Sequence, residues 1–165
     1  MQSKTKKLVL AAMLAALSCV ATMVIKIPYP QGYLNLGDAV VLLSGWLLSP
    51  LYGFLAAGVG SALADVFSGY VVYAPVTFAI KGAMALLMAT LARGFAKKMP
   101  SLLGIVLAAV LAEVLMVAGY LVFEGILYGF AAAVLNIPFN AIQGAAGLVL
   151  GCVLIKLFSK YNFVK

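Results

Sequence analysis

The chain has 165 residues, of which 66% are hydrophobic and only 9% are charged. A soluble domain carries roughly 45–50% apolar and about 25% charged residues, so most of this chain must face lipid instead of water. The net charge of +7 would suggest nucleic acid if it covered a polar surface, but the basic residues form short clusters between apolar runs. The composition therefore excludes a soluble or nucleic-acid-binding domain and indicates a multi-pass membrane protein.

Apolar runs and prolines predict six helices, since one membrane span needs about 20 apolar residues. A first helix over 5–25 precedes Pro28 and Pro30, which no ordinary helix tolerates, and the segment 26–37 is expected to be loop-like. The next apolar run is too long for one comfortable span, and Pro50 divides it because proline is favoured in the first turn of a helix. The remaining boundaries give helices over 36–48, 50–67, 75–93, 101–123 and 138–159, the last opening at Pro138.

Three basic clusters test this number of spans. They lie before the first helix, between the fourth and fifth helices, and at the end of the chain. Six spans place all three clusters on one face, which the positive-inside rule makes cytoplasmic, whereas five spans would place the middle cluster outside. We therefore expect one domain over 1–165, an all-α bundle of six transmembrane helices with both termini cytoplasmic. The clusters are Lys4, Lys6 and Lys7; Arg93, Lys97 and Lys98; and Lys156, Lys160 and Lys165.

Strongly polar side chains inside a membrane are costly and usually serve a function. On the predicted helices they all fall in the outer half, with Lys81 roughly 9 Å and Glu113 roughly 15 Å below the outer helix ends. Their opposite charges at comparable depth predict that they pair with each other. A few convergent polar groups in an apolar setting are typical of a small-molecule pocket. The residues concerned are Asp38, Asp65, Lys81, Glu113, Asn140 and Gln143.

Each of these residues also has a purely structural interpretation. Asp38 could cap the second helix, Asp65 could be solvated at the interface, and Lys81 could extend outward to water. Glu113 could be no more than the partner of Lys81, and the two amides could only link helices. The outer aromatic residues are either an interfacial belt or stacking surfaces for a planar ligand. These are Tyr33, Tyr70, Tyr73, Phe78, Tyr120 and Tyr128.

Small residues at four-residue spacing form a second feature, because they let helix backbones approach closely. The first helix carries two interleaved pairs of alanines, and the last helix carries Gly147 and Gly151. The stripe on the first helix serves either internal packing or the docking of a partner membrane protein. Its residues are Ala11, Ala12, Ala15 and Ala16.

The chemistry-bearing motifs of enzymes do not occur in this sequence. There is no histidine, which is the commonest general base and metal ligand, and no Walker A, GxGxxG, GxSxG or HExxH sequence. We therefore expect no cofactor, no metal and no ATP hydrolysis in this chain. An intramembrane enzyme that uses Glu113 and Lys81 as acid and base, or a scaffold protein, remain alternatives.

Several stretches together resemble the substrate-binding S component of energy-coupling factor (ECF) vitamin transporters. They are the basic N-terminus with its alanine-striped helix, YLNLGDAVVLLSGWLLSPLYGFLAAGVGSALADVFSGY at 33–70, YAPVTFAIKG at 73–82 and NIPFNAIQGAAGLVLG at 136–151. The resemblance covers nearly the whole chain. It is strongest to the branch for hydroxymethylpyrimidine or pyridoxine-type substrates, with riboflavin- and pantothenate-type relatives behind.

The resemblance implies a six-helix subunit of the bacterial plasma membrane that captures a vitamin from outside and is not an enzyme. It also implies partners: a transmembrane coupling subunit, which the alanine stripe would face, and two cytoplasmic ATPases that bind the ATP. The segments 26–37 and 68–74 would cover the site. The substrate-binding residues expected from the polar cluster and the resemblance are Tyr33, Asn35, Asp38, Asp65, Tyr73, Lys81, Glu113, Tyr120, Asn140 and Gln143.

Overall fold

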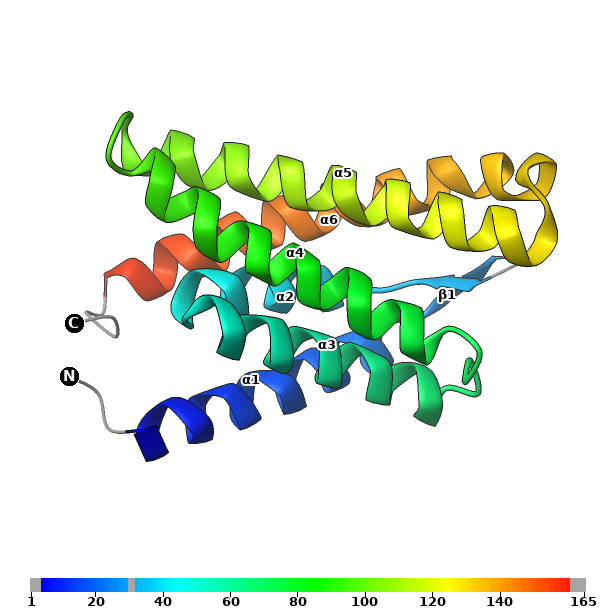
Figure 1. Ribbon diagram of the computed structural model, residues 1–165, viewed down its shortest axis with the longest axis horizontal. Coiled ribbons are helices and arrows are strands. Elements are labelled where there is room, and N and C mark those ends of the chain that lie inside the picture. Colours follow the sequence, from blue (N-terminus) through cyan, green and yellow to red (C-terminus); the bar gives the residue numbers. More distant parts are fainter. Residues whose placement is uncertain (1–3, 30–31, 161–165) are drawn as a thin grey trace.

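The computed structural model describes residues 4–29 and 32–160, and within these ranges the chain forms six helices and one short hairpin (Figure 1). The predicted order of helices is confirmed. Pro30 and Lys165, which entered the sequence argument, lie outside the described residues. The elements are α1 (Lys4–Val24), β1 (Ile27–Tyr29), β2 (Gly32–Leu34), α2 (Gly37–Leu47), α3 (Pro50–Phe67), α4 (Ala74–Phe95), α5 (Ser101–Tyr128) and α6 (Phe130–Ser159).

The predicted break before Pro50 is confirmed, but α2 is too short to span a membrane. Its 11 residues reach only about 16 Å at 1.5 Å per residue. The other five helices are long and apolar enough to cross. Within α2 every residue except Trp46 is buried, so this short apolar helix lies inside the bundle and faces protein on all sides.

The connection between α5 and α6 differs from the prediction. The residues 124–137 were expected to form an outer loop, but α5 continues to Tyr128 and α6 starts at Phe130. Gly129 makes the turn between them with φ of 89°, a left-handed backbone that glycine adopts without strain. Pro138 lies inside α6, where it removes one backbone hydrogen bond and its ring crowds the preceding turn. Membrane-spanning helices tolerate such a proline where neighbouring groups satisfy the freed backbone carbonyl. Glycine, and not proline, therefore sets this boundary.

The segment 26–37 is not simply a loop. β1 and β2 pair antiparallel, with Ile27 opposite Leu34 and Pro28 opposite Tyr33. Proline is tolerated here because a two-stranded hairpin consists of edge strands alone. At its base Lys26 Nζ donates a hydrogen bond to Ser68 Oγ at 2.8 Å, which fastens the hairpin to the connection between α3 and α4.

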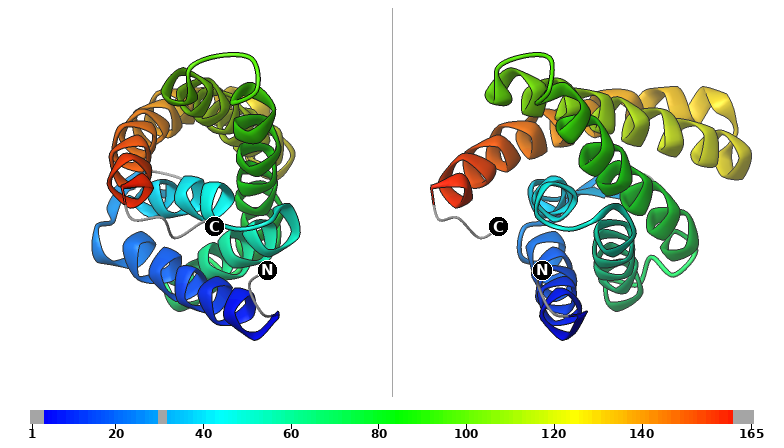
Figure 2. Two further views of the ribbon diagram at one scale, coloured as in Figure 1. Left: turned by 90° about the vertical axis from the view of Figure 1, so that its left-hand side faces the viewer. Right: turned by 60° about the vertical axis from the view of Figure 1, so that its left-hand side comes forward.

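Five helices form an open arc of neighbours around α2. Along the chain α3 packs on α4, α4 on α5 and α5 on α6, while α1 packs on α3, and α2 contacts α1, α3, α4 and α6 (Figure 2). The start of α1 and the end of α6 lie at one end of the bundle, together with the α4–α5 connection (Figure 1). The hairpin and the α5–α6 turn lie at the opposite end. We call these the termini end and the hairpin end.

Helices α1 and α3 pack so closely at Gly60 that a single added methyl group would clash. A Cβ at Gly60 would lie 2.3 Å from the backbone oxygen of Ala15 and 2.8 Å from Ser18 Cβ. Backbone cannot move aside cheaply, so Gly60→Ala should destabilise the bundle by about 1–3 kcal/mol. Thermal unfolding of the detergent-solubilised protein measures the loss. Gly94→Ala is the control, because nothing lies within 4 Å of its Cβ position and alanine favours helix; equal midpoints for both variants would contradict the close packing.

Candidate ligand-binding site

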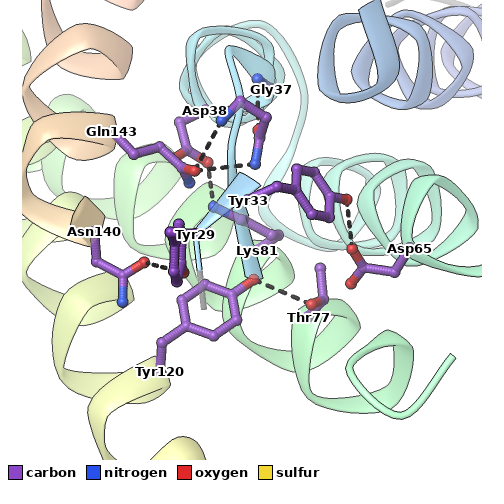
Figure 3. Close-up of polar contacts among 11 residues, drawn as sticks. Tyr29, Tyr33, Gly37, Asp38, Asp65, Thr77, Lys81, Tyr120, Asn140 and Gln143 are labelled. Carbon is purple, nitrogen blue, oxygen red and sulfur yellow. Dashed lines mark hydrogen bonds and ion pairs between the residues drawn. The ribbon is translucent and has the colours of Figure 1, made fainter. Parts of the chain in front are cut away.

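A small cavity lies at the hairpin end, enclosed by the hairpin, the α3–α4 connection and the helices around it. Its volume is about 30 Å³, which is room for one or two water molecules. The lining comes from segments far apart in the sequence, which the fold brings together (Figure 3). The lining residues are Tyr29, Gly32, Tyr33, Asn35, Asp65, Tyr70, Tyr73, Tyr120, Asn140 and Gln143.

Five of the ten lining residues are tyrosines, and four of their rings form a continuous series of contacts from Tyr33 through Tyr70 and Tyr73 to Tyr120. The ring centroids are 4.9 Å apart for Tyr33 and Tyr70, 6.2 Å for Tyr70 and Tyr73, and 6.5 Å for Tyr73 and Tyr120. Tyr29 instead stacks on Phe139 of α6 at 4.9 Å. Such rings present flat apolar faces together with hydroxyl groups, which suits a planar ligand with polar edges.

Asp65 supplies the one charged side chain among the residues that line the cavity. Its Oδ1 accepts a hydrogen bond from the Tyr33 hydroxyl at 2.6 Å, while its buried Oδ2 has no partner among the described residues. Burial raises the pKa of the Tyr33 phenol, and the adjacent Asp65 carboxylate raises it further. Tyr33 therefore stays protonated and donates. Asp65 is only 6% exposed, so the solvated interpretation is wrong, and its Oδ2 is a buried acceptor next to the cavity.

Gln143 joins the cavity wall to the charges beneath it. Its Oε1 accepts from the Asn35 backbone N–H at 3.1 Å and from Asn35 Nδ2 at 3.0 Å. Its Nε2 donates to Asp38 Oδ2 at 2.7 Å, which fixes the orientation of the amide (Figure 3). On the same helix Asn140 Oδ1 accepts from the Tyr29 hydroxyl at 3.2 Å. Both amides thus connect α6 to the hairpin segment and also line the cavity.

The expected pair of Lys81 with Glu113 is wrong, because Lys81 pairs with Asp38. The Lys81 ammonium bonds Asp38 Oδ1, and both side chains are almost completely buried (Figure 3). The fold explains why Asp38 and not Glu113 is the partner of Lys81: α2 lies inside the bundle against α4, so the first turn of α2, which carries Asp38, meets Lys81. Asp38 therefore does more than cap a helix, and Lys81 does not extend to water. Lys81 Nζ also lies 5.5 Å from the ring centroid of Tyr120, directly under the cavity wall.

Glu113 lies beside this pair without joining it. Neither carboxylate oxygen has a hydrogen-bond partner among the described residues, although the side chain is only 6% exposed. Its oxygens face Gly144 and Gly147, whose Cβ positions would lie 3.2 and 2.9 Å away. Because α5 runs on to Tyr128, Glu113 lies roughly 22 Å from the outer end of its helix, deeper than expected.

The sequence did not predict two residues of the hairpin end, Tyr29 and Glu124, as part of the site region. Tyr29 lies between two prolines in a segment taken for a loop, and only the hairpin places it over α6. Glu124 was assigned to an outer loop, but it is fully buried and accepts from Asn136 Nδ2 at 2.7 Å and from the Tyr73 hydroxyl at 3.5 Å. The sequence did contain a signal for this pair, because Glu124 and Asn136 lie on either side of Gly129, where a turn brings two helices together.

Of the ten expected substrate-binding residues, seven line the cavity and three lie beneath it. The three beneath are Asp38, Lys81 and Glu113. The alanine stripe of α1 is divided: Ala11 is buried and Ala15 half-buried toward α3, whereas Ala12 and Ala16 are exposed. Among the described residues no three acidic, cysteine or histidine side chains are placed to hold a metal ion. The seven that line the cavity are Tyr33, Asn35, Asp65, Tyr73, Tyr120, Asn140 and Gln143.

A bundle of membrane-spanning helices with a polar, aromatic cavity at one end defines a multi-pass membrane protein with a small-molecule site. The family model of the ECF-type riboflavin transporter, S component, matches residues 2–160. The chain belongs to this family. A relative from Pyrococcus woesei, described as "Uncharacterized protein in gap 3'region", is 40% identical over 134 residues, which are 80% of this chain and 87% of the relative.

Solved structures share the fold. The S component of a bacterial ECF transporter superposes with a TM-score of 0.76 at 23% identity, covering 96% of this chain and 98% of the other. The S component for biotin from an ECF-type ABC transporter gives a TM-score of 0.60 at 18% identity, covering 94% and 95%. The six-helix arrangement with a short, buried α2 is thus an S-component fold.

Proposed function

We propose that this protein is the substrate-capture subunit of an ECF-type vitamin importer and binds a neutral, planar heteroaromatic vitamin or precursor at the hairpin end. The observation that supports this most is the cavity lining: five tyrosines, three amide side chains, one carboxylate and no basic residue. Aromatic faces stack on a planar ring, and the free Asp65 oxygen and the amides accept and donate at its edge.

The charge of the lining argues against an anionic vitamin. The Lys81 ammonium is bonded to Asp38 beneath the cavity, and Lys26 lies outside it with its Nζ bonded to Ser68. A ligand carboxylate would therefore meet the Asp65 carboxylate with no basic side chain in the lining to pair with. Lys81 Nζ and Lys26 Nζ lie 5.5 and 5.7 Å from the centroids of the lining Tyr120 and Tyr33 rings, and each is already bonded to another side chain. This favours a hydroxymethylpyrimidine- or pyridoxine-like ligand over pantothenate.

Riboflavin is the second candidate, because the matching family model is that of riboflavin transporters. It is neutral and planar as well, so the same lining suits it. The two candidates differ in size: the cavity of about 30 Å³ holds neither, since ligand sites usually measure 300–1,000 Å³. The aromatic side chains and the hairpin must move apart for any vitamin, and a three-ring ligand requires a larger displacement than a single ring.

The orientation and the partners form part of the proposal. As far as the described residues go, the three basic clusters lie at the start of α1, at the α4–α5 connection and at the end of α6, which together form the termini end. The positive-inside rule then favours that end as the cytoplasmic one and the cavity as the outer one. The exposed Ala12 and Ala16 leave a small-residue stripe of α1 open for a transmembrane coupling subunit, whereas Ala11 is buried and Ala15 packs α1 against Gly60 of α3. ATP would then be bound by the ATPase subunits of that module and not by this chain.

Calorimetry of the purified chain against a vitamin panel tests the proposal. Hydroxymethylpyrimidine, pyridoxine and riboflavin represent neutral planar ligands, and pantothenate and biotin represent anionic ones. We expect saturable heat from at least one neutral ligand and at least about a hundredfold weaker binding of both anions, or about 2.7 kcal/mol. Tight binding of an anion would refute the charge argument while leaving vitamin capture intact. No binding across the panel, together with no vitamin found by mass spectrometry after purification, would refute the capture function.

A further inference from the structure

Two cavities larger than the candidate ligand-binding site lie at the termini end, remote from that site. Two adjoining cavities measure about 400 Å³ and about 300 Å³, and they share Trp46, Ser101 and Ile105 in their linings. They arise because α2 ends at Leu47 while the neighbouring helices continue toward the termini end. Viewed from that end, α4, α5 and α6 form an arc around the end of α2 (Figure 2). We call the two cavities together the inner groove.

The inner groove combines an apolar interior with cationic edges. Its lining is mostly apolar and consists of Trp46 of α2 with alanine, leucine and isoleucine side chains of α4, α5 and α6. Arg93 of α4 lines one cavity and Lys156 of α6 lines the other, both exposed, and no acidic residue lines either. An occupant with an anionic head and an apolar body matches this distribution.

The Arg93 guanidinium is held in place at the edge of the inner groove. Its Nη2 donates to the backbone oxygen of Leu48, at the end of α2, at 2.6 Å. A guanidinium carries five N–H donors in a rigid fork that matches phosphate oxygens, so donors remain for a ligand. Ser101 lines both cavities and offers a hydroxyl as a neutral donor.

We propose that the inner groove binds an anionic phospholipid of the surrounding membrane, with its phosphate at the cationic edges that Arg93 and Lys156 provide and an acyl chain against Trp46 and Ile105. The charge complementarity favours a lipid over a protein segment, because the edges offer cations to a phosphate while the interior offers only apolar contact. Basic pockets between transmembrane helices near the cytoplasmic face bind anionic lipid headgroups in other membrane proteins. The site does not depend on the vitamin pocket.

The chain contains a built-in reporter for this site. Trp46 is its single tryptophan, and it lines both cavities of the inner groove. The experiment reconstitutes the full chain into phosphatidylcholine vesicles and measures quenching of Trp46 fluorescence by brominated acyl chains. Brominated phosphatidylglycerol is compared with brominated phosphatidylcholine at equal mole fraction, so that lipid contacting the outside of the bundle contributes equally to both.

We expect the brominated anionic lipid to occupy the site with roughly tenfold preference over the zwitterionic one, or about 1.4 kcal/mol. Lys156→Gln and Arg93→Gln should each reduce this preference. Lys98→Gln should leave it unchanged, because Lys98 is a basic residue of the same end that lines neither cavity. Equal quenching by the two lipids would overturn the proposal. So would equal losses in Lys98→Gln and Lys156→Gln, which would show general attraction to the basic end.

Discussion

Lys81→Met is expected to be the most damaging single substitution in the bundle. It leaves the Asp38 carboxylate unpaired at a position with 0% exposure. Removing one partner of a buried ion pair costs about 3–5 kcal/mol, because the remaining charge has lost its counter-ion without regaining water. For a chain of this size we expect the thermal midpoint to fall by about 10 °C or more in detergent, or the protein to be lost during purification.

The double variant Asp38→Asn with Lys81→Met separates charge from packing. It removes both charges and keeps a polar side chain opposite Gln143, so it should recover most of the lost stability. Lys98→Met is the matched control for the substitution itself, because Lys98 is exposed. Glu113→Gln should not lower the midpoint, since that carboxyl has no partner to lose among the described residues. A double variant as unstable as Lys81→Met would contradict the ion-pair explanation.

Asp65→Asn is expected to have the largest effect on vitamin affinity at little cost in stability. The amide keeps the shape of the side chain and one acceptor for the Tyr33 hydroxyl, but it puts N–H donors in place of an acceptor oxygen. Hydrogen bonds to a charged group contribute about 1.5–3 kcal/mol, which predicts a loss of roughly ten- to a hundredfold in affinity. Calorimetry with whichever vitamin the panel identifies measures this loss directly.

Tyr52→Phe serves as the control for Asp65→Asn. Tyr52 lies on the same helix as Asp65 but does not line the cavity, so the affinity should not change. Equal affinity in Asp65→Asn and the unmodified chain would show that the free Asp65 oxygen does not contact the ligand. In that case the ligand contacts would have to come from the amides and tyrosines of the opposite wall.

The helices could be predicted from the sequence because each apolar run must satisfy its own backbone within lipid. Ends set by a strong local signal were predicted well: α3 begins at Pro50, and α4 begins within one residue of the predicted start. The α5–α6 turn was misplaced because Pro138 was given more weight than Gly129, although membrane-spanning helices tolerate an interior proline where their surroundings satisfy the freed backbone carbonyl. The hairpin was missed because two three-residue strands leave no periodic pattern to detect.

The sequence by itself determined the class of protein, the order of its helices and the residue types that gather at the hairpin end. These follow from burial costs, which act on each residue separately. Only the tertiary structure decided that Lys81 pairs with Asp38 and not with Glu113, that Tyr29 and Tyr70 complete the cavity, and that α2 stops short and leaves the inner groove. Which charges pair depends on which helices face each other. The burial of α2 among the other helices brings Asp38 against α4, and the spacing of residues along a single helix does not reveal that burial.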